Sequence, residues 1–274
     1  MEQTLEVSRI KEYGYDTVPI ANALVGKLDA LDDLWKQFLA QSEEVKSRHV
    51  FVNGAGYEAK GPLSRDYKEN FHVKLGYTLP SGHTELDARF VEMSKRIINY
   101  SIPAVRLVMD AINQQTGFDL GPMVFDSMDQ WVLRALWYPA REIDLTKSAV
   151  VAEEHLDKGI TLHLRESDSG FELFWRGKWI AVPHQKGRGI FYAGLLGQLY
   201  TECTMKAVLH RGVFNATTQY LGRRAFVLFI DFGKLKYYKA KWRTTHEAFP
   251  SCSNYDMGPD EFAKYFTEVE LATD

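Results

Sequence analysis

Glu154-His155-Leu156-Asp157-Lys158-Gly159-Ile160-Thr161-Leu162 is the stretch from which the fold of this chain can be predicted. Side chains alternate between the two faces of a strand, so a strand here would put His155 and Asp157 on the same face. An imidazole and a carboxylate so placed can ligate one metal ion. His210, in the segment Met205–Arg211, is the candidate third ligand. Two histidines and one carboxylate would leave further coordination positions open.

The composition shows that the chain has enough apolar residues to bury a large core. Of its 274 residues, 45% are hydrophobic and 13% aromatic. The formal net charge is -3 and the pI is near 6.3, which argues against a nucleic-acid-binding protein with its usual basic face. A chain of this length can be one large domain, and all-β barrels of this size often are.

The cysteines and the N-terminus predict the compartment. Cys203 and Cys252 have no short spacing, which fits a reducing compartment and excludes a cysteine-based zinc site. The segment Met1–Glu6 lacks the features of a signal peptide. The longest run without polar residues or glycine is Ala225–Ile230, too short to cross a bilayer. We therefore expect a cytoplasmic protein without a membrane partner. Its oligomeric state is open, and a monomer is compatible with the sequence.

Helical periodicity dominates the first part of the chain. Leu28–Val45 has apolar residues at steps of three and four, which predicts an amphipathic helix. Thr84–Thr116 has the same spacing, with Pro103 expected to kink or split the helix. A tail helix is predicted at Asp260–Leu271, after Pro259.

Short strands bounded by Gly, Pro and Asp follow Gly121. The strand candidates are Gln130–Tyr138, Ser148–His155, Thr161–Arg165, Phe171–Trp175, Trp179–Val182, Gly189–Ala193, Thr204–His210 and Arg223–Asp231. Such a series after a helical lead-in predicts a mainly β fold with flanking helices and a jelly-roll (double-stranded β-helix) core. We expect one domain over 1–274, with a largely helical lead-in at 1–120, the core at 121–235 and a C-terminal helical cover at 236–274.

Several motifs occur in a characteristic order along the candidate core. After His155 and Asp157 come Gly177-Lys178-Trp179-Ile180-Ala181-Val182-Pro183, Gly194 through Gln198, His210-Arg211 and Arg223-Arg224-Ala225. This order resembles the isopenicillin N synthase-like family of Fe(II)/2-oxoglutarate-dependent oxygenases, over roughly residues 132–232. That family reads H-T-D, G-x-W-I-x-V-x-P, G-D-x-x-Q, H-R and R-x-S in the same succession.

The resemblance implies roles for the metal-binding and cosubstrate residues. His155, Asp157 and His210 would be the catalytic iron ligands, although zinc, nickel or manganese could occupy the same atoms. Arg223 would bind the distal carboxylate of 2-oxoglutarate, with Ala225 where the family has a serine. An arginine suits this role because its fork pairs two oxygens at once. Arg224, on the opposite face of the strand, is the alternative.

The predicted strand Gln130–Tyr138 also matches the family and contains further candidate residues. Tyr138 aligns with the tyrosine that binds the cosubstrate in the family. Alternatively, it is an aromatic residue of the core. Leu136 replaces the usual asparagine, and Gly194-Leu195 departs from the family's G-D. By alternation Arg134 shares the face of Tyr138, so it would bind either an anionic substrate group or an internal carboxylate.

The function that the resemblance implies is oxidation of an unactivated C–H bond of a small molecule of specialised metabolism. Hydroxylation, desaturation and cyclisation are the possible outcomes, with Fe(II), 2-oxoglutarate and O2 as the reagents and no nucleic-acid partner. His163 would line the substrate pocket, or would be an ordinary barrel histidine. A 2-oxoglutarate-independent Fe(II) oxidase of the same fold is an alternative. A non-catalytic or zinc-binding jelly-roll is another.

Overall fold

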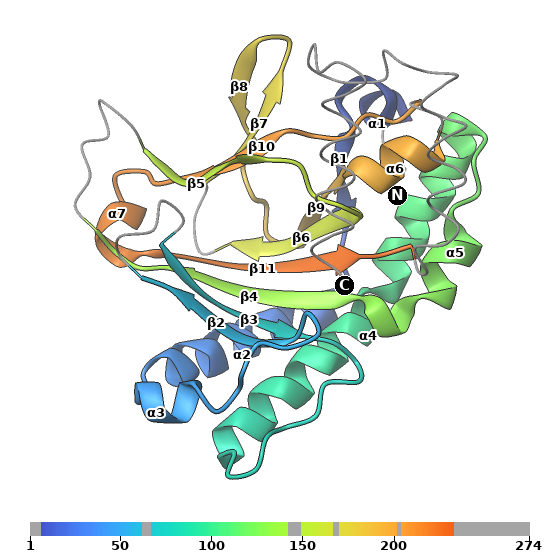
Figure 1. Cartoon of the computed structure of the whole chain (residues 1–274). Helices are drawn as coiled ribbons and strands as arrows, with labels where there is room; N and C mark the ends of the chain where they lie inside the picture. Colours follow the sequence, from blue (N-terminus) through green and yellow to red (C-terminus); the bar gives the residue numbers. More distant parts are fainter. Residues whose placement is uncertain (1–6, 62–66, 142–148, 167–169, 202–203, 233–274) are drawn as a thin grey trace.

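Two antiparallel sheets that face each other form the centre of the computed structural model (Figure 1). The structure describes residues 7–61, 67–141, 149–166, 170–201 and 204–232. The strands are β1 (Tyr15–Pro19), β2 (Gly56–Lys60), β3 (Lys68–Val73), β4 (Val132–Tyr138), β5 (Val150–His155), β6 (Ile160–Glu166), β7 (Phe171–Trp175), β8 (Lys178–Ala181), β9 (Arg188–Ala193), β10 (His210–Val213) and β11 (Arg223–Ile230). The larger sheet has the order β1-β9-β6-β11-β4-β3-β2, and the smaller one β5-β10-β7-β8.

The strands from β4 onward form a jelly-roll. The chain crosses from the larger sheet to the smaller one between β4 and β5 and between β6 and β7, and crosses back after β5 and after β8. β9, β10 and β11 continue this alternation, so two four-stranded layers enclose one interior. The predicted fold class, mainly β with flanking helices, is confirmed.

The lead-in contributes more strand than the sequence predicted. β1 pairs with β9 at one end of the larger sheet, and β2 and β3 extend the other end next to β4. The description of 1–120 as largely helical is therefore incomplete. Apolar alternation is weak in β2 and β3, because their inner-face residues Glu58, Asn70 and His72 are polar.

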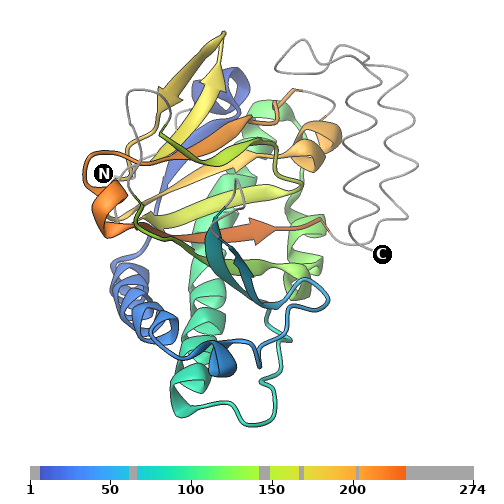
Figure 2. The same cartoon turned by 60° about the vertical axis from the view of Figure 1, so that its left-hand side comes forward.

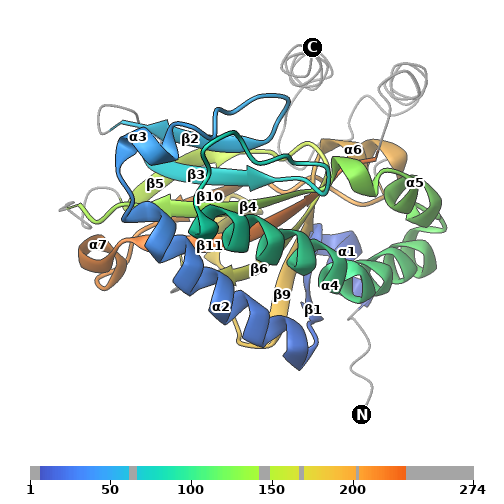
Figure 3. The same cartoon turned by 90° about the horizontal axis from the view of Figure 1, so that it is seen from below.

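Helices cover the outer face of the larger sheet (Figure 3). The helices of the described ranges are α1 (Val7–Tyr13), α2 (Asn22–Leu39), α3 (Glu43–Lys46), α4 (Glu85–Thr116), α5 (Gly121–Asp126), α6 (Leu195–Tyr200) and α7 (Thr218–Leu221). α2 and α4 cross this face, and the main core lies between them and the sheet, including Trp35, Phe90 and Phe226. Figure 2 shows the smaller sheet on the side of the larger one away from these helices.

The long helix α4 is continuous across Pro103, so of the kink and the split that the sequence allowed, the split does not occur. Proline removes one backbone hydrogen bond and costs roughly 3 kcal/mol inside a helix. Buried residues on both sides of it, such as Ile98 and Val105, pack into the same core and hold the two halves together. Thr84 and Asp87 form a capping box at the start, and Gly117 ends the helix with φ 78°.

The predicted helix over Leu28–Val45 is two helices in the structure. α2 begins six positions earlier, because buried Leu24 already belongs to its apolar stripe, and ends at Leu39. The chain then turns at Gln41, whose side chain donates to Asp87, and continues as α3. No helix in the described ranges is long and apolar enough to span a membrane. The predicted tail helix Asp260–Leu271 lies outside the described residues.

Candidate metal centre

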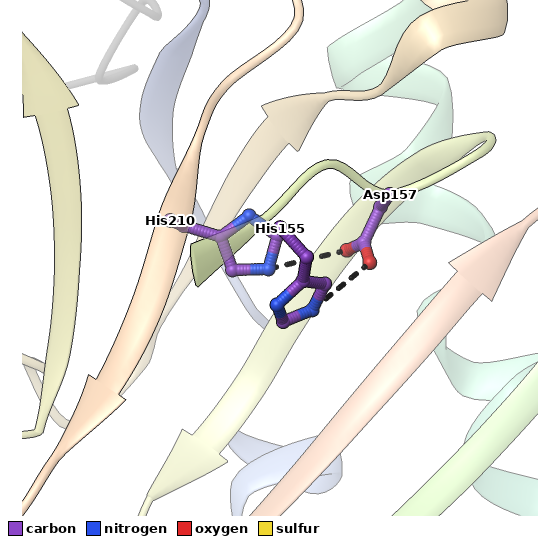
Figure 4. A group of neighbouring side chains, drawn as sticks. All are labelled: His155, Asp157 and His210. Atoms are coloured by element: carbon purple, nitrogen blue, oxygen red, sulfur yellow. Dashed lines mark ion pairs between the residues drawn. The ribbon is translucent and has the colours of Figure 1, made fainter. Parts of the chain in front are cut away.

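Three predicted ligands converge at one edge of the jelly-roll interior (Figure 4). His155 Nε2 lies 3.7 Å from Asp157 Oδ1, and His210 Nε2 lies 3.7 Å from Asp157 Oδ2. The two imidazole ring centroids are 4.3 Å apart. The side chain of His155 is 49% exposed, whereas those of Asp157 and His210 are 9% and 7% exposed. The group is therefore open to solvent on the His155 side.

The two histidines are cross-strand neighbours. His155 ends β5 and pairs directly with His210, which begins β10. Opposed residues of antiparallel strands have Cβ atoms about 5 Å apart, which accounts for the proximity of the two rings. The predicted strand Thr204–His210 is wrong, because only its last residue belongs to β10.

The segment before His210 is held by a side chain and by single backbone hydrogen bonds, outside any regular strand. The backbone N–H of Ala207 donates to Gln198 Oε1 at 2.7 Å, and that of Val208 donates to the carbonyl of Ala193. Gln198 is the last residue of the motif that begins at Gly194. It thus fixes the approach of the chain to His210.

Asp157 does not lie on a strand, so the predicted geometry of the His-x-Asp pair is wrong. β5 ends at His155 and β6 begins at Ile160, which leaves Asp157 in the connecting loop. Three backbone hydrogen bonds hold this loop, from the N–H groups of residues 194, 195 and 196 to the carbonyls of residues 159, 157 and 158. The two groups meet because a rigid loop turns the carboxylate toward the histidines.

Two glycines of the sequence motifs permit this close approach. A Cβ on Gly194 would lie 2.2 Å from the carbonyl oxygen of Asp157, and one on Gly159 would lie 2.2 Å from that of Ile230. Both neighbours are backbone atoms that cannot rotate away. Any side chain at either glycine would displace the loop that carries the carboxylate.

Both histidines hold the tautomer that a metal ligand needs. His155 Nδ1 lies 2.8 Å from the carbonyl of Glu153, and His210 Nδ1 lies 3.0 Å from that of Val208. A carbonyl can only accept a hydrogen bond, so each Nδ1 carries the proton. Each Nε2 then presents a lone pair toward Asp157, and the backbone fixes the ring orientation.

Electrostatics keep the carboxylate charged and the buried imidazole neutral. Burial would raise the pKa of Asp157, but the charges of His210 and His155, a hydrogen bond from Thr161 and the charge of Arg134 together lower it. Burial lowers the pKa of His210 to about 4, with Asp157 opposing the shift. At neutral pH the site therefore offers one negative charge and a neutral imidazole, which are the forms that bind a metal.

Two residues near the ligands were missed by the sequence reasoning. Thr161 Oγ1 donates to Asp157 Oδ2 at 2.7 Å, and Tyr192 Oη lies 3.4 Å from His210 Nε2. Burial and the Asp157 carboxylate raise the pKa of Tyr192, so its phenol stays protonated. Thr161 and Tyr192 are cross-strand partners in β6 and β9. The available signal was strand periodicity, which places Thr161 on the same face as His163, and Tyr192 on the same face as Ile190.

A metal ion fits the converging atoms. Two atoms that each lie about 2.1 Å from one ion can be at most about 4.2 Å apart, and both 3.7 Å contacts to Asp157 meet this limit. They are also too long for direct hydrogen bonds. The ligand atoms of all three residues lie within 4.8 Å of one another, and the exposed ring of His155 can move to close the remaining gap.

The predicted cosubstrate residues lie along the same interior, where Arg223 is already paired. Its Nη2 atom donates to Glu166 Oε1 at 2.6 Å, and both side chains are buried. Glu166 and nearby Tyr138 raise the pKa of Arg223 against the effect of burial. The guanidinium lies 5.4 Å from the ring centroid of Tyr138, and Ala225 is fully buried on the same strand face.

His163 lies beside this ion pair. Its Nε2 is 3.2 Å from the same Glu166 oxygen, without the alignment of a hydrogen bond. Burial, reinforced by the charge of Arg223, lowers its pKa well below the usual value, so the ring is neutral. Glu166 was not predicted from the sequence as a partner of Arg223.

The two adjacent arginines of β11 point to opposite faces of the sheet. Arg224 Nε donates to Asp32 of α2 at 2.7 Å, on the outer face that the helices cover. Arg223 points into the jelly-roll. Arg134 of β4 also belongs to the interior, where its guanidinium lies 4.4 Å from the ring centroid of Phe229.

Comparison with known proteins reveals the fold but no close relative. No protein-family model matches the chain, and no curated protein matches it. A full-length Neurospora crassa protein, solved with 2-oxoglutarate and 5-formyluracil, is 21% identical with a TM-score of 0.70 over 82% of this chain and 76% of that one. A putative 2OG-Fe(II) oxygenase family protein from Caulobacter crescentus is 21% identical with a TM-score of 0.69, over 96% and 92%.

A third solved structure widens this picture. JOX2, in complex with 2OG, Fe and JA, is 16% identical with a TM-score of 0.63, over 83% of this chain and 70% of that one. At these identities the similarity demonstrates a shared fold and nothing more about this chain.

Proposed function

We propose that the protein is an Fe(II)- and 2-oxoglutarate-dependent oxygenase that oxidises an unactivated C–H bond of a small molecule. The observation that carries this proposal is the convergence of His155 Nε2, His210 Nε2 and the Asp157 carboxylate, with both imidazoles fixed in the metal-binding tautomer. Two histidines and one carboxylate leave coordination positions open, as non-haem Fe(II) oxygenases require. The folds of proteins solved with 2-oxoglutarate and iron add support.

The protein's own residues would hold and orient the centre. With Fe(II), 2-oxoglutarate and O2 bound, the centre would supply a C–H oxidation in which 2-oxoglutarate leaves as succinate and CO2 and one oxygen atom enters the substrate. His155 and His210 would each bind through Nε2, and Asp157 would offset one positive charge. Thr161 would keep the carboxylate turned toward the ion by its bond to Oδ2.

The cosubstrate would be held at the other end of the interior. Arg223 is the proposed partner of the distal carboxylate, with the Tyr138 hydroxyl as a further donor and Ala225 leaving room beside it. The carboxylate of Glu166 already accepts from Arg223, so the cosubstrate carboxylate would replace it or share the guanidinium with it. Arginine can do either, because it has five donors.

The pairing of Arg223 with Glu166 favours one alternative. If Glu166 keeps Arg223, the cation is no longer available to an incoming dicarboxylate, and the protein would be an Fe(II) oxidase that works without 2-oxoglutarate. The apolar Leu136 and Ala225 beside this pair, where the resembling family has polar residues, point in the same direction. A zinc-binding jelly-roll would use the same three ligands but would consume no O2.

The test is to load the metal-free protein with Fe(II) and 2-oxoglutarate without oxygen, and then to admit O2. Under the proposal, O2 is consumed and succinate forms, and both stop when zinc replaces iron. Consumption of O2 that does not need 2-oxoglutarate would identify the oxidase. No O2 consumption with any member of a small-molecule panel would contradict both. The net charge of -3 supports a small-molecule substrate and not a nucleic acid, and the two widely spaced cysteines support a reducing compartment such as the cytoplasm.

A further inference from the structure

The interior carries two arginines whose surroundings differ. Arg223 pairs across the ladder with Tyr138, and Arg134 pairs with Val227, four positions further along β11. At about 3.3 Å per residue, the two backbone positions are roughly 13 Å apart along the strand. One small carboxylate cannot bind both. Glu166 neutralises Arg223, so the question is what neutralises Arg134.

Within the described part of the chain, Arg134 forms no ion pair. The side chain is half-buried, but its Nε atom is buried and has no hydrogen-bond partner there, and its guanidinium stacks over Phe229. A buried arginine nitrogen without an acceptor is costly, because the lost hydration is not replaced.

The residues around Arg134 are neutral and able to donate hydrogen bonds. His72 is its cross-strand partner in β3, and burial, reinforced by the charge of Arg134, lowers the His72 pKa well below the usual value. Asn70 binds the His72 ring. The nearest carboxylate on β2, Glu58, is held by Asn70. No described carboxylate forms an ion pair with Arg134, and Asp157 acts on it only from a distance.

An apolar segment borders the same region. The side chains of Val50, Phe51 and Val52 are 67%, 40% and 60% exposed, and the Phe51 ring lies 4.8 Å from the His72 ring. Exposed apolar residues that adjoin a polar recognition point are typical of a ligand entrance. A ligand that fits here has a negative charge at one end and an apolar body.

We infer that Arg134 is a substrate-binding residue and that the substrate is a small carboxylic acid, whose carboxylate takes the place of the missing acceptor. This assignment rests on the proposed function and specifies its substrate class. The carboxylate would accept from Nε of Arg134, and the apolar body would lie along Phe51 and Phe229. The metal ligands would then face a carbon of that body.

The test measures binding without turnover. The full chain is loaded with Ni(II), and its melting temperature and binding isotherms are recorded with short alkanoic and arylalkanoic acids and with the matched primary amides. We expect acids to bind about 10- to 100-fold more tightly than their amides, as for a charge-assisted hydrogen bond. Arg134→Gln should remove this preference, and Arg134→Lys should keep part of it.

Arg106→Gln is the matched control. The Arg106 guanidinium lies 4.5 Å from the ring centroid of Phe125, so it makes the same stacking contact on α4, away from the interior. This variant should keep the full preference for acids. Equal binding of acids and amides, no binding of either, or a preference that survives Arg134→Gln would overturn the inference.

A second pair of ligands separates substrate from cosubstrate. 2-Oxobutyrate has the metal-chelating end of 2-oxoglutarate but no distal carboxylate. Arg134→Gln should leave the affinity for both unchanged. If it weakens only 2-oxoglutarate, the carboxylate at Arg134 belongs to the cosubstrate and the substrate assignment is wrong. The proposed function fails separately, through absence of succinate in the wild-type reaction.

Discussion

The two polar groups inside the jelly-roll are built differently. At the metal end, His155, Asp157 and His210 point toward one another but stay too far apart for hydrogen bonds. At the arginine end, Arg223 and Glu166 are already joined at 2.6 Å. In the first group the ligand atoms face one another without a direct bond, whereas in the second an ion pair joins the charged groups, although Arg223 Nε has no hydrogen-bond partner among the described residues. The first arrangement leaves room for an ion between its atoms, and the second does not.

The largest expected effect is at the metal end. His210→Ala should abolish Fe(II) binding and turnover, because it removes one of three protein ligands. The fold should persist, since the backbone ladder between β5 and β10 does not depend on the His210 side chain. Metal content after desalting and circular dichroism measure the two effects. His83→Ala, at an exposed histidine, is the control, and normal iron content in His210→Ala would refute the ligand assignment.

The arginine end should respond in the opposite way, through stability. Arg223→Met leaves the Glu166 carboxylate buried and unpaired, so the free energy of unfolding should fall by roughly 3–5 kcal/mol. The double variant Arg223→Met/Glu166→Met should recover most of that loss. Urea denaturation of the metal-free protein measures both. A loss below about 1 kcal/mol in the single variant would mean that the pair is solvated and open to exchange.

Thr161 tests how far the metal end depends on its supporting hydrogen bond. Thr161→Val keeps the shape but removes the donor to Asp157 Oδ2. Loss of such an orienting partner typically weakens metal binding 10- to 100-fold. Fe(II) titration under anaerobic conditions gives the affinity, with Thr17→Val, at a threonine of β1, as the control. Unchanged affinity would show that the loop backbone alone positions the carboxylate.

The smallest expected effect is on 2-oxoglutarate affinity, which depends on both the metal end and the arginine end. Glu166→Gln removes the carboxylate that occupies Arg223, so the 2-oxoglutarate affinity of the Ni(II)-loaded protein should rise by about 10-fold. Arg224→Gln, on the outer face, should leave that affinity unchanged. If Glu166→Gln has no effect, then Arg223 is not the cosubstrate anchor, and the oxidase alternative gains weight.

Much of the jelly-roll could be predicted because its strands are short, apolar and separated by turn residues. The order of β4 to β9 and of β11 followed from that pattern, with boundaries that differ by one or two residues. The start of β10 could not be located, since the apolar segment before His210 is held by the Gln198 side chain and by single backbone hydrogen bonds, and is not a regular strand. β1, β2 and β3 were missed because polar residues on their buried or inner faces, such as Asp16, Asn70 and His72, interrupt the apolar alternation.

The grouping of His155, Asp157 and His210 could be predicted, but not the way in which they meet. The sequence predicted that His155 and Asp157 lie close together because they share one face of a strand. In the structure Asp157 lies in a loop, so the two residues meet for a different reason. The contact between Arg223 and Glu166 depends on the register of β6 against β11, which contains an irregularity after Phe226. Such a shift reverses which side chains share a face and leaves no signal in residue order.

A metal-bound crystal structure tests the central claim most directly. Crystals grown without oxygen in the presence of Fe(II) should show anomalous scattering at the iron edge from one ion in the interior. The account predicts that ion within about 2.2 Å of His155 Nε2, His210 Nε2 and an Asp157 oxygen, with the remaining positions facing Arg134 and Arg223. An ion bound elsewhere, or no ion between these three residues at saturating Fe(II), would contradict it.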